Sequence, residues 1–223
     1  MNSIYGEGPV NKQKAKYMKW KSLAIMSVLF LMNTTLFSQE KETPSASRKE
    51  NLKKLFDYRY KGGFYSFEEK FNNTVEYPEY ARMNCVMGIV VLGIVIDCEG
   101  TPQQISLKTS LGYGTNEELT KLFNSTMGEW NKCTDDKYTR FEIPIQFKIK
   151  GTETNTEDAL FVVEGEMPGH SCNDDSFYLK KAEKALEKKN GKKALKYINL
   201  LLQRNPYSLQ YQDMKTQAIS FMK

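Results

Sequence analysis

Residues 141–149 (FEIPIQFKI) place an apolar side chain at every second position. This period of two predicts a β-strand with one buried face. Pro144 lies within the strand and has no amide hydrogen, so the side to which that amide would point cannot be fully paired. We therefore predict that the strand lies at a sheet edge, which is the ordinary docking place for an incoming peptide strand.

Two alternatives to peptide docking also explain such an edge. A free edge is a liability that proteins normally cover, and a second copy of the chain could pair with it to form a homodimer. Residues 159–163 (ALFVV) are apolar enough to cover the edge from within the chain. All three interpretations remain open at the level of sequence.

The other elements predict an α+β fold. Residues 88–97 (GIVVLGIVID) are almost wholly apolar, which indicates a strand covered on both faces. Residues 103–109 alternate and follow a turn, so these two segments predict a hairpin. Residues 64–71 carry three phenylalanines at helical spacing, and residues 115–118 (TNEE) have the capping pattern that opens a second helix.

The segment from residue 175 onwards has a helical pattern with two interruptions. Asn190-Gly191 predicts a turn and Asn205-Pro206 predicts a stop, so we expect a helical hairpin followed by one further helix. The spacings resemble a single tetratricopeptide repeat, with Tyr178, Ala182, Ala194, Ile198 and Pro206 as the matching residues. One repeat cannot bury its own apolar face, so this segment must pack on the sheet domain, on a second copy or on a partner.

Residues 22–37 (SLAIMSVLFLMNTTLF) form a short apolar run that follows five lysines and ends at Ser38. This arrangement is typical of an export signal. The run is short for a membrane span, which needs roughly 20 apolar residues. We expect cleavage after Ser38, with retention as an anchor as the alternative. The expected organisation is a signal peptide or anchor at 1–38, a flexible tether at 39–61, a sheet domain at 62–150, a linker at 151–174 and a helical segment at 175–223.

The four cysteines are Cys85, Cys98, Cys133 and Cys172. An even number in an exported chain permits disulfides. Cys85 and Cys98 flank the predicted strand, whose ends lie roughly 30 Å apart at 3.3 Å per residue, so these two cannot bridge each other. The disulfide pairing that we would test first is Cys98 with Cys133. The alternative is that all four cysteines are free thiols.

The composition gives no sign of catalysis or of nucleic-acid binding. The net charge of +5 comes largely from the expected signal, because the acidic residues of 39–173 offset the basic C-terminal segment and the chain after residue 38 is almost neutral. A nucleic-acid partner is therefore not expected. His170 is the only histidine, and no nucleophile and acid can be assembled around it. We expect no enzyme, no catalytic residue, no metal site and no cofactor.

Residues 62–149 resemble the C-terminal domain of TonB proteins of the kind common in the Bacteroidetes. The resemblance rests on the order and spacing of many common residues rather than on one specific motif. The matching residues are Gly62-Gly63, Phe64, Phe67, Tyr77-Pro78, Ala81, Gly88, Asp97, Gly100, Leu111-Gly112, Gly114, Glu117-Glu118-Leu119, Trp130, Pro144-Ile145 and Phe147.

The resemblance implies a small three-stranded antiparallel sheet with helices on one face, in a periplasmic protein. It further implies a role in TonB-dependent transport across the outer membrane, in which the last strand pairs with an extended segment of an outer-membrane receptor or another envelope protein. The implied peptide-binding residues are Arg140, Phe141, Glu142, Ile143, Pro144, Ile145, Gln146, Phe147 and Lys148, with Tyr77, Pro78, Gly112 and Tyr113 shaping the nearby surface.

Two features depart from the family pattern. The tether of about 23 residues reaches only about 80 Å when fully extended, and cleavage of the signal would cut the link to an inner-membrane motor. Binding of a receptor-like peptide is compatible with both features. Both features count against transmission of energy, and the sequence does not decide between binding alone and transduction. The alternative function is a periplasmic scaffold in which the helical segment binds the partner and the sheet domain is structural.

Overall fold

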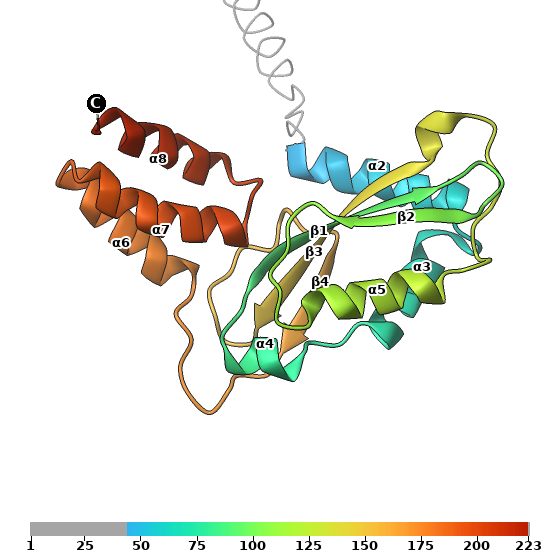
Figure 1. Ribbon diagram of the computed structural model, residues 1–223, viewed down its shortest axis with the longest axis horizontal. Helices are drawn as coiled ribbons and strands as arrows, with labels where there is room; N and C mark the ends of the chain where they lie inside the picture. The colour runs from blue at the N-terminus through green and yellow to red at the C-terminus, as the bar shows by residue number, and fades with distance from the viewer. Residues whose placement is uncertain (1–43, 223) are drawn as a thin grey trace, which may run out of the picture. The chain divides into compact units, whose positions relative to one another are not determined.

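The computed structural model describes residues 44–222 (Figure 1). This part of the chain is an α+β structure with seven α-helices and one four-stranded sheet. The strands are β1 (Gly88–Ile96), β2 (Pro102–Leu107), β3 (Arg140–Ile149) and β4 (Phe161–Gly165), in the order β2-β1-β3-β4. The predicted α+β class is confirmed, whereas the predicted three-stranded antiparallel sheet is wrong.

Strand β1 lies at the centre of the sheet. It pairs antiparallel with β2, as in Leu92 opposite Leu107, and antiparallel with β3, as in Val91 opposite Pro144. All of its residues but one are buried. The apolar run was therefore a correct sign of a strand covered on both faces.

Strand β4 is the element that the sequence analysis assigned to a linker. It pairs parallel with β3 from Ile145 opposite Phe161 to Ile149 opposite Gly165. The pairing is introduced by a hydrogen bond of 2.8 Å from the amide of Leu160 to the carbonyl oxygen of Pro144. The prediction that β3 is an edge strand is therefore wrong, and the alternative of covering by residues 159–163 is what the structure shows.

The N-terminal helix α2 (Pro44–Arg59) occupies the place of the expected tether. Only the second half of α2 packs in the core, where Phe56 is fully buried. The ring of Phe56 lies 4.3 Å from that of Phe67 and 5.4 Å from that of Phe141, measured between centroids. The tether prediction failed because residues 44–51 carry no apolar periodicity of their own, and their helix is stabilised by tertiary contacts such as those of Ser45 with Glu157 and of Arg48 with Asp158.

Three more helices complete this part of the fold. Helix α3 (Gly63–Thr74) buries the predicted stripe of Phe64, Phe67 and Phe71, and α5 (Thr115–Ser125) buries Leu119, Leu122 and Phe123. The short α4 (Glu79–Met83) begins directly after Pro78, which suits a proline-led first turn. Aromatic side chains from α2, α3, β3 and β4 fill the core that these helices form with the sheet.

The C-terminal helices α6 (Asp175–Glu187), α7 (Gly191–Arg204) and α8 (Leu209–Ser220) form a second apolar cluster (Figure 1). Close packing of α7 on α8 requires a glycine, since a β-carbon on Gly191 would lie 2.3 Å from the carbonyl oxygen of Ala218. Helix α7 also contacts the start of β1, where a β-carbon on Gly88 would lie 2.8 Å from the α-carbon of Arg204. The helical segment therefore packs on the sheet domain as well as on itself.

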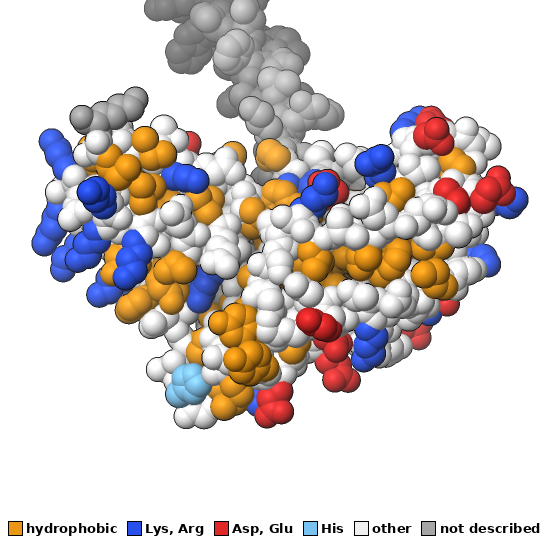
Figure 2. Space-filling view, in the orientation of Figure 1, with side chains coloured by type: hydrophobic (Ala, Val, Ile, Leu, Met, Phe, Trp, Pro, Cys, Tyr) orange, Lys and Arg blue, Asp and Glu red, His pale blue; other side chains and the backbone are white. Residues whose placement is uncertain are grey.

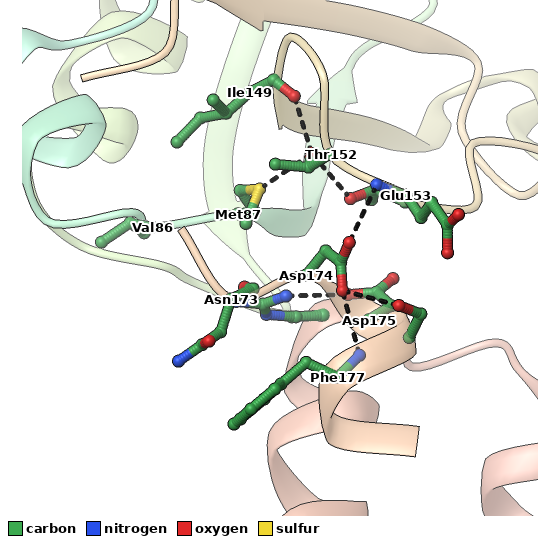
Figure 3. A network of polar contacts seen from close by, with 12 residues as sticks. Val86, Met87, Ile149, Thr152, Glu153, Asn173, Asp174, Asp175 and Phe177 are labelled. Atoms are coloured by element: carbon green, nitrogen blue, oxygen red, sulfur yellow. Dashed lines mark hydrogen bonds and ion pairs between the residues drawn. The ribbon is translucent and has the colours of Figure 1, made fainter. Parts of the chain in front are cut away.

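Polar contacts attach the helical segment to the loop after β3 (Figure 3). The carboxylate of Asp174 caps α6 by accepting from the amide of Phe177 at 3.0 Å, and it also accepts from the amide of Glu153 at 3.4 Å. The hydroxyl of Thr152 donates to the carbonyl oxygen of Ile149 at 2.6 Å. The cap of α6 and the end of β3 are thus held by one continuous network.

Two disulfides are present. Cys98 and Cys133 are joined with their α-carbons 4.5 Å apart, which is the pair that the sequence analysis placed first. Cys85 and Cys172 are joined with their α-carbons 5.4 Å apart, across 87 residues of sequence. The second disulfide ties the segment before β1 to the segment before α6.

Candidate functional site

The predicted docking strand β3 is used by the protein itself. Because the carbonyl of Pro144 faces β4, the main-chain groups of Gln146 and Lys148 face β4 as well, since successive residues of a strand point their main-chain groups to opposite sides. β4 occupies these groups from Pro144 to Ile149. Pairing with β4 does not reach Arg140–Ile143, so within the described chain only this short stretch of β3 lies outside it.

The side chains of β3 have structural roles. Phe141, Ile143, Ile145 and Phe147 lie in the core, as the alternation predicted. Glu142 pairs with Lys108 at 3.9 Å and Lys148 pairs with Glu164 at 3.6 Å, while Arg140 is exposed. Gln146 is fully buried, donates to the carbonyl oxygen of Phe147 at 2.9 Å and leaves its side-chain oxygen without a hydrogen-bond partner.

The outer strands of the sheet are β2 and β4. The carbonyl oxygen of Gly165 accepts from the amide of Lys150 at 2.9 Å, so the main-chain groups of Gly165, and by alternation those of Val163 and Phe161, face β3. The amides of Val162 and Glu164 therefore point toward the outer side of β4. The same alternation on β2 directs the amide of Ile105 outward, because Lys108 donates inward to Val91 at 2.9 Å. The unpaired edges of the sheet therefore lie at β4 and β2, and not at β3 as predicted.

A cavity of about 340 Å³ lies at the outer edge of β4. Its lining consists of Phe71, Asn72, Val75, Glu76, Tyr77, Val162, Val163 and Glu164. Val163 is buried while Val162 and Glu164 are exposed, which is the alternation of side chains between the two faces of a strand. The cavity is therefore lined by residues whose side chains point to both faces of the strand. It lies beside the edge of β4, where a further strand would pair.

Tyr77 forms one wall of this cavity. Its ring lies 5.6 Å from that of Phe147 and packs directly on Gly165, and its hydroxyl donates to the carbonyl oxygen of Val86. Burial raises the pKa of the Tyr77 phenol well above its ordinary value, so the ring is a neutral and fixed surface. Tyr77, which we predicted to shape the surface near the binding strand, thus lies at the C-terminal end of β4.

The other predicted surface residues lie elsewhere. Pro78 lies against Gly114, where an added β-carbon would be 3.0 Å from the β-carbon of Pro78, and the exposed ring of Tyr113 lies 5.3 Å from that of Tyr80. Gly112 has a left-handed backbone with φ of 67° beside them. Among the described residues, none of Pro78, Gly112 and Tyr113 lines the cavity at β4.

The sequence analysis missed most of the cavity wall. Phe71 was predicted only as a core residue, and its ring stacks on that of Phe161 at 4.4 Å. Glu76 and Glu164 were not singled out, although they are the two charged side chains of the lining and both are acidic. The available signal was the apolar run 159–163, whose pairing with β3 creates the new edge.

One group of side chains among the described residues has the proximity that a metal site needs. It consists of Cys85, His170 and Cys172, whose ligand atoms all lie within 4.8 Å of one another. The two cysteines are joined in a disulfide, and Nε2 of His170 lies 3.5 Å from Sγ of Cys85. The sequence suggested only the nearness of His170 to Cys172, because Cys85 is far away along the chain.

Comparison of the chain with protein-family models, with curated proteins and with solved structures finds no match. The resemblance to TonB C-terminal domains therefore rests on the residues of the chain alone. Within residues 44–222, no helix has the length and apolar character that crossing a membrane requires. The expected export signal at 22–37 lies outside the described residues.

Proposed function

We propose that this chain is an exported, TonB-like protein-binding module that captures an extended segment of an envelope protein by strand addition along the outer edge of β4. The partner segment carries apolar residues at alternate positions and at least one Lys or Arg. On the resemblance to TonB C-terminal domains, we propose an outer-membrane TonB-dependent receptor as the source of the segment. The chain acts by binding, and no catalytic step is part of the proposal.

The observation that carries this proposal is the cavity beside β4, next to the outward amides of Val162 and Glu164. An extended peptide gains its affinity from main-chain hydrogen bonds to such an edge and its specificity from pockets for alternate side chains. The five residues of β4 offer an edge of about 17 Å. Val75 and Val162 provide the apolar lining for one inserted side chain.

Charge favours a basic residue in the incoming segment. Glu76 and Glu164 both line the cavity. Glu164 pairs with Lys148 at 3.6 Å, across an ion pair that is partly exposed to solvent, and Lys150 lies near enough to attract it. A Lys or Arg on the peptide would complement the remaining negative charge, and complementarity of this kind contributes mainly to specificity and to the rate of association.

The test begins with a library of random peptides displayed on phage and selected on the purified protein. We expect the selected peptides to alternate apolar residues and to be enriched in Lys or Arg. Nuclear magnetic resonance of the complex should place the chemical-shift changes and new protection from exchange at Phe161–Gly165. Peptides that perturb β2 or the helices α6–α8 instead would overturn the assignment to β4.

A matched pair of proline substitutions provides the quantitative test. Val162→Pro removes an outward donor at the β4 edge, and Ile105→Pro removes the outward donor at the β2 edge. We expect the first to weaken binding by about tenfold or more and the second to leave it within about twofold. Circular dichroism melting must show that both variants fold. The reverse pattern of affinities would assign the site to β2, and self-association at the concentrations used would favour the homodimer.

The second candidate function is a scaffold in which the helical segment is the binding element. The observation in its favour is that these helices carry exposed apolar side chains, namely Phe177, Leu200, Leu209 and Ile219. Figure 2 shows hydrophobic and basic side chains together over the C-terminal helices, and residues 174–223 hold 11 Lys and Arg against 5 Asp and Glu. Under this alternative, Leu209→Asp would abolish binding and Val162→Pro would not affect it.

A further inference from the structure

The disulfide Cys85–Cys172 lies where two distant segments meet beside the only histidine of the chain. Cys85 follows α4 and Cys172 precedes α6, and the neighbouring residues Val86 and Asn173 lie in the same small region of Figure 3. His170 is exposed, and both cysteines are half-buried. A soluble reductant and a metal ion can therefore reach this group of side chains from solvent.

The other disulfide has a different environment. Sγ of Cys133 accepts a hydrogen bond of 2.9 Å from the guanidinium of Arg59, whose side chain is fully buried. The Cys98–Cys133 bridge is thus anchored to the interior, whereas the Cys85–Cys172 bridge has an exposed imidazole as its polar neighbour. All four cysteines are half-buried, so exposure alone does not rank the two bridges in thiol–disulfide exchange, and a reductant can reach both.

We propose that reduction of Cys85–Cys172 converts this bridge into a zinc site, with the thiolates of Cys85 and Cys172 and Nε2 of His170 as ligands. A tetrahedral Zn²⁺ with bonds of about 2.3 Å to sulfur and about 2.0 Å to nitrogen places those two ligand atoms about 3.6 Å apart. Nε2 of His170 and Sγ of Cys85 already lie 3.5 Å apart. The two sulfurs must separate to about 3.8 Å, a change that side-chain rotation can supply.

The ligand types select the metal. Thiolate and imidazole together suit zinc, whereas carboxylate and carbonyl oxygens suit magnesium and calcium. Three protein ligands leave the fourth position to water, as in open zinc sites. The disulfide and the zinc site use the same two sulfur atoms, so the two states exclude each other.

The conversion is a balanced exchange. The reductant is a dithiol: one of its thiolates attacks a sulfur of Cys85–Cys172 and forms a mixed disulfide, and its second thiol then resolves this intermediate. The dithiol loses two electrons and becomes a disulfide, and the protein gains two thiols. Binding of Zn²⁺ then releases the two thiol protons to solvent.

The surrounding contacts keep the segments of Cys85 and Cys172 close together after the disulfide is reduced. The hydrogen bond from the amide of Glu153 to the carboxylate of Asp174 and the ion pair of Arg204 with Asp175, at 2.9 Å, hold the start of α6 without the disulfide. Arg204 also donates to the carbonyl oxygen of Asn173 at 3.0 Å. The metal would restore a link between the same two segments that the disulfide joins in the oxidised protein.

The experiment uses the purified protein without a polyhistidine tag. It is reduced by a phosphine, freed of reductant under anaerobic conditions and titrated with Zn²⁺ against a chromogenic chelator. We expect one Zn²⁺ per chain in the reduced protein and none at that affinity in the oxidised protein. Co²⁺ in place of Zn²⁺ should give the absorption bands of thiolate coordination, and the ring signals of the single histidine should shift.

Variants separate this site from other thiols. His170→Ala alters an exposed side chain and keeps both cysteines, and we expect it to weaken Zn²⁺ binding by more than about tenfold, since even the loss of an outer partner of a metal ligand costs that much. Cys98→Ser with Cys133→Ser should retain the site, and Cys85→Ser with Cys172→Ser should lose it. Equal Zn²⁺ affinity in the His170→Ala and unmodified proteins, or in the oxidised and reduced proteins, would overturn the proposal.

Discussion

The ring of Tyr77 lies directly on the α-carbon of Gly165, so that a β-carbon at Gly165 would come within 2.7 Å of ring atom Cγ. This contact closes the C-terminal end of β4 against the segment that follows α3. It also fixes the wall of the cavity in which we place the partner segment. The glycine is required here by the close approach of the ring.

Replacement of Gly165 by alanine should therefore destabilise the protein. Overpacking of this kind typically costs about 1–3 kcal/mol, because the buried Tyr77 ring must move. Gly169→Ala is the matched control, since no atom lies within 4 Å of the position of its β-carbon. Urea unfolding should show a lower free energy of unfolding for Gly165→Ala and almost no change for Gly169→Ala. Equal effects of the two substitutions would contradict the packing that we describe.

Arg59 is a buried cation that binds only main-chain oxygens and one sulfur. Its guanidinium donates to the carbonyl oxygens of Asn131 at 3.0 Å, Tyr138 at 2.7 Å and Asp97 at 2.7 Å. Arg59→Met would leave three partly buried carbonyl oxygens without this donor, at about 1–3 kcal/mol each. We expect a loss of at least about 3 kcal/mol in the free energy of unfolding, measured by urea denaturation. Arg140→Met, at an exposed arginine, should change it by less than about 0.5 kcal/mol.

Glu129 should contribute to the acid sensitivity of the fold. Partial burial would raise the pKa of its carboxyl, but hydrogen bonds from Lys70, at 2.7 Å, and from Tyr60 outweigh burial and lower the pKa below the ordinary 4.5. A group whose pKa is lowered by folding stabilises the folded state above its ordinary pKa, and this contribution is lost as the pH falls through the folded value. Glu129→Gln should therefore flatten the fall in stability below about pH 4.5.

The measurement for Glu129 is the free energy of unfolding in urea at a series of pH values from neutral to acid. Glu183→Gln, at an exposed position in α6, is the control and should leave the pH dependence unchanged. If the Glu129→Gln protein and the unmodified protein lost stability in parallel below pH 4.5, the assignment to Glu129 would be wrong.

Asp158 joins the N-terminal helix to the C-terminal helices. One carboxylate oxygen lies 2.8 Å from the guanidinium of Arg48, and the other accepts from the side-chain amide of Asn205 at 3.0 Å. The Arg48 guanidinium also stacks 3.9 Å from the ring centroid of Tyr207. Asp158→Ala should cost about 1–3 kcal/mol, because hydrogen bonds to a charged and partly buried group are lost.

Hydrogen exchange is the specific measurement for Asp158→Ala. We expect faster exchange in α2 and around Asn205, with the core of β1 unchanged. Asp213→Ala, at an exposed aspartate of α8, should leave both the stability and the exchange pattern as they are. Uniform acceleration across all elements would instead indicate a global loss of stability with no local role for Asp158.

The local patterns of the sequence determined most of the secondary structure. The apolar run at β1, the alternation at β3, the phenylalanine stripe of α3 and the interruptions at Asn190-Gly191 and Asn205-Pro206 are each visible in one stretch of chain. These patterns depend on which side chains are buried, and period and burial are linked within a single element. The separation of Cys85 from Cys98 by a full strand likewise excluded one disulfide from sequence alone.

Only the tertiary structure decided where the sheet ends. Pro144 correctly indicated that one side of β3 is incompletely paired, but the chain could fill the rest of that side with its own residues 160–165 or leave it to a partner. Both outcomes satisfy the same local pattern, because strand pairing is a contact between segments distant in sequence. For the same reason α2 was predicted as a tether, and His170 was expected to lie near Cys172 alone. Phe56 meets its aromatic neighbours, and His170 meets Cys85, only when the fold brings them together.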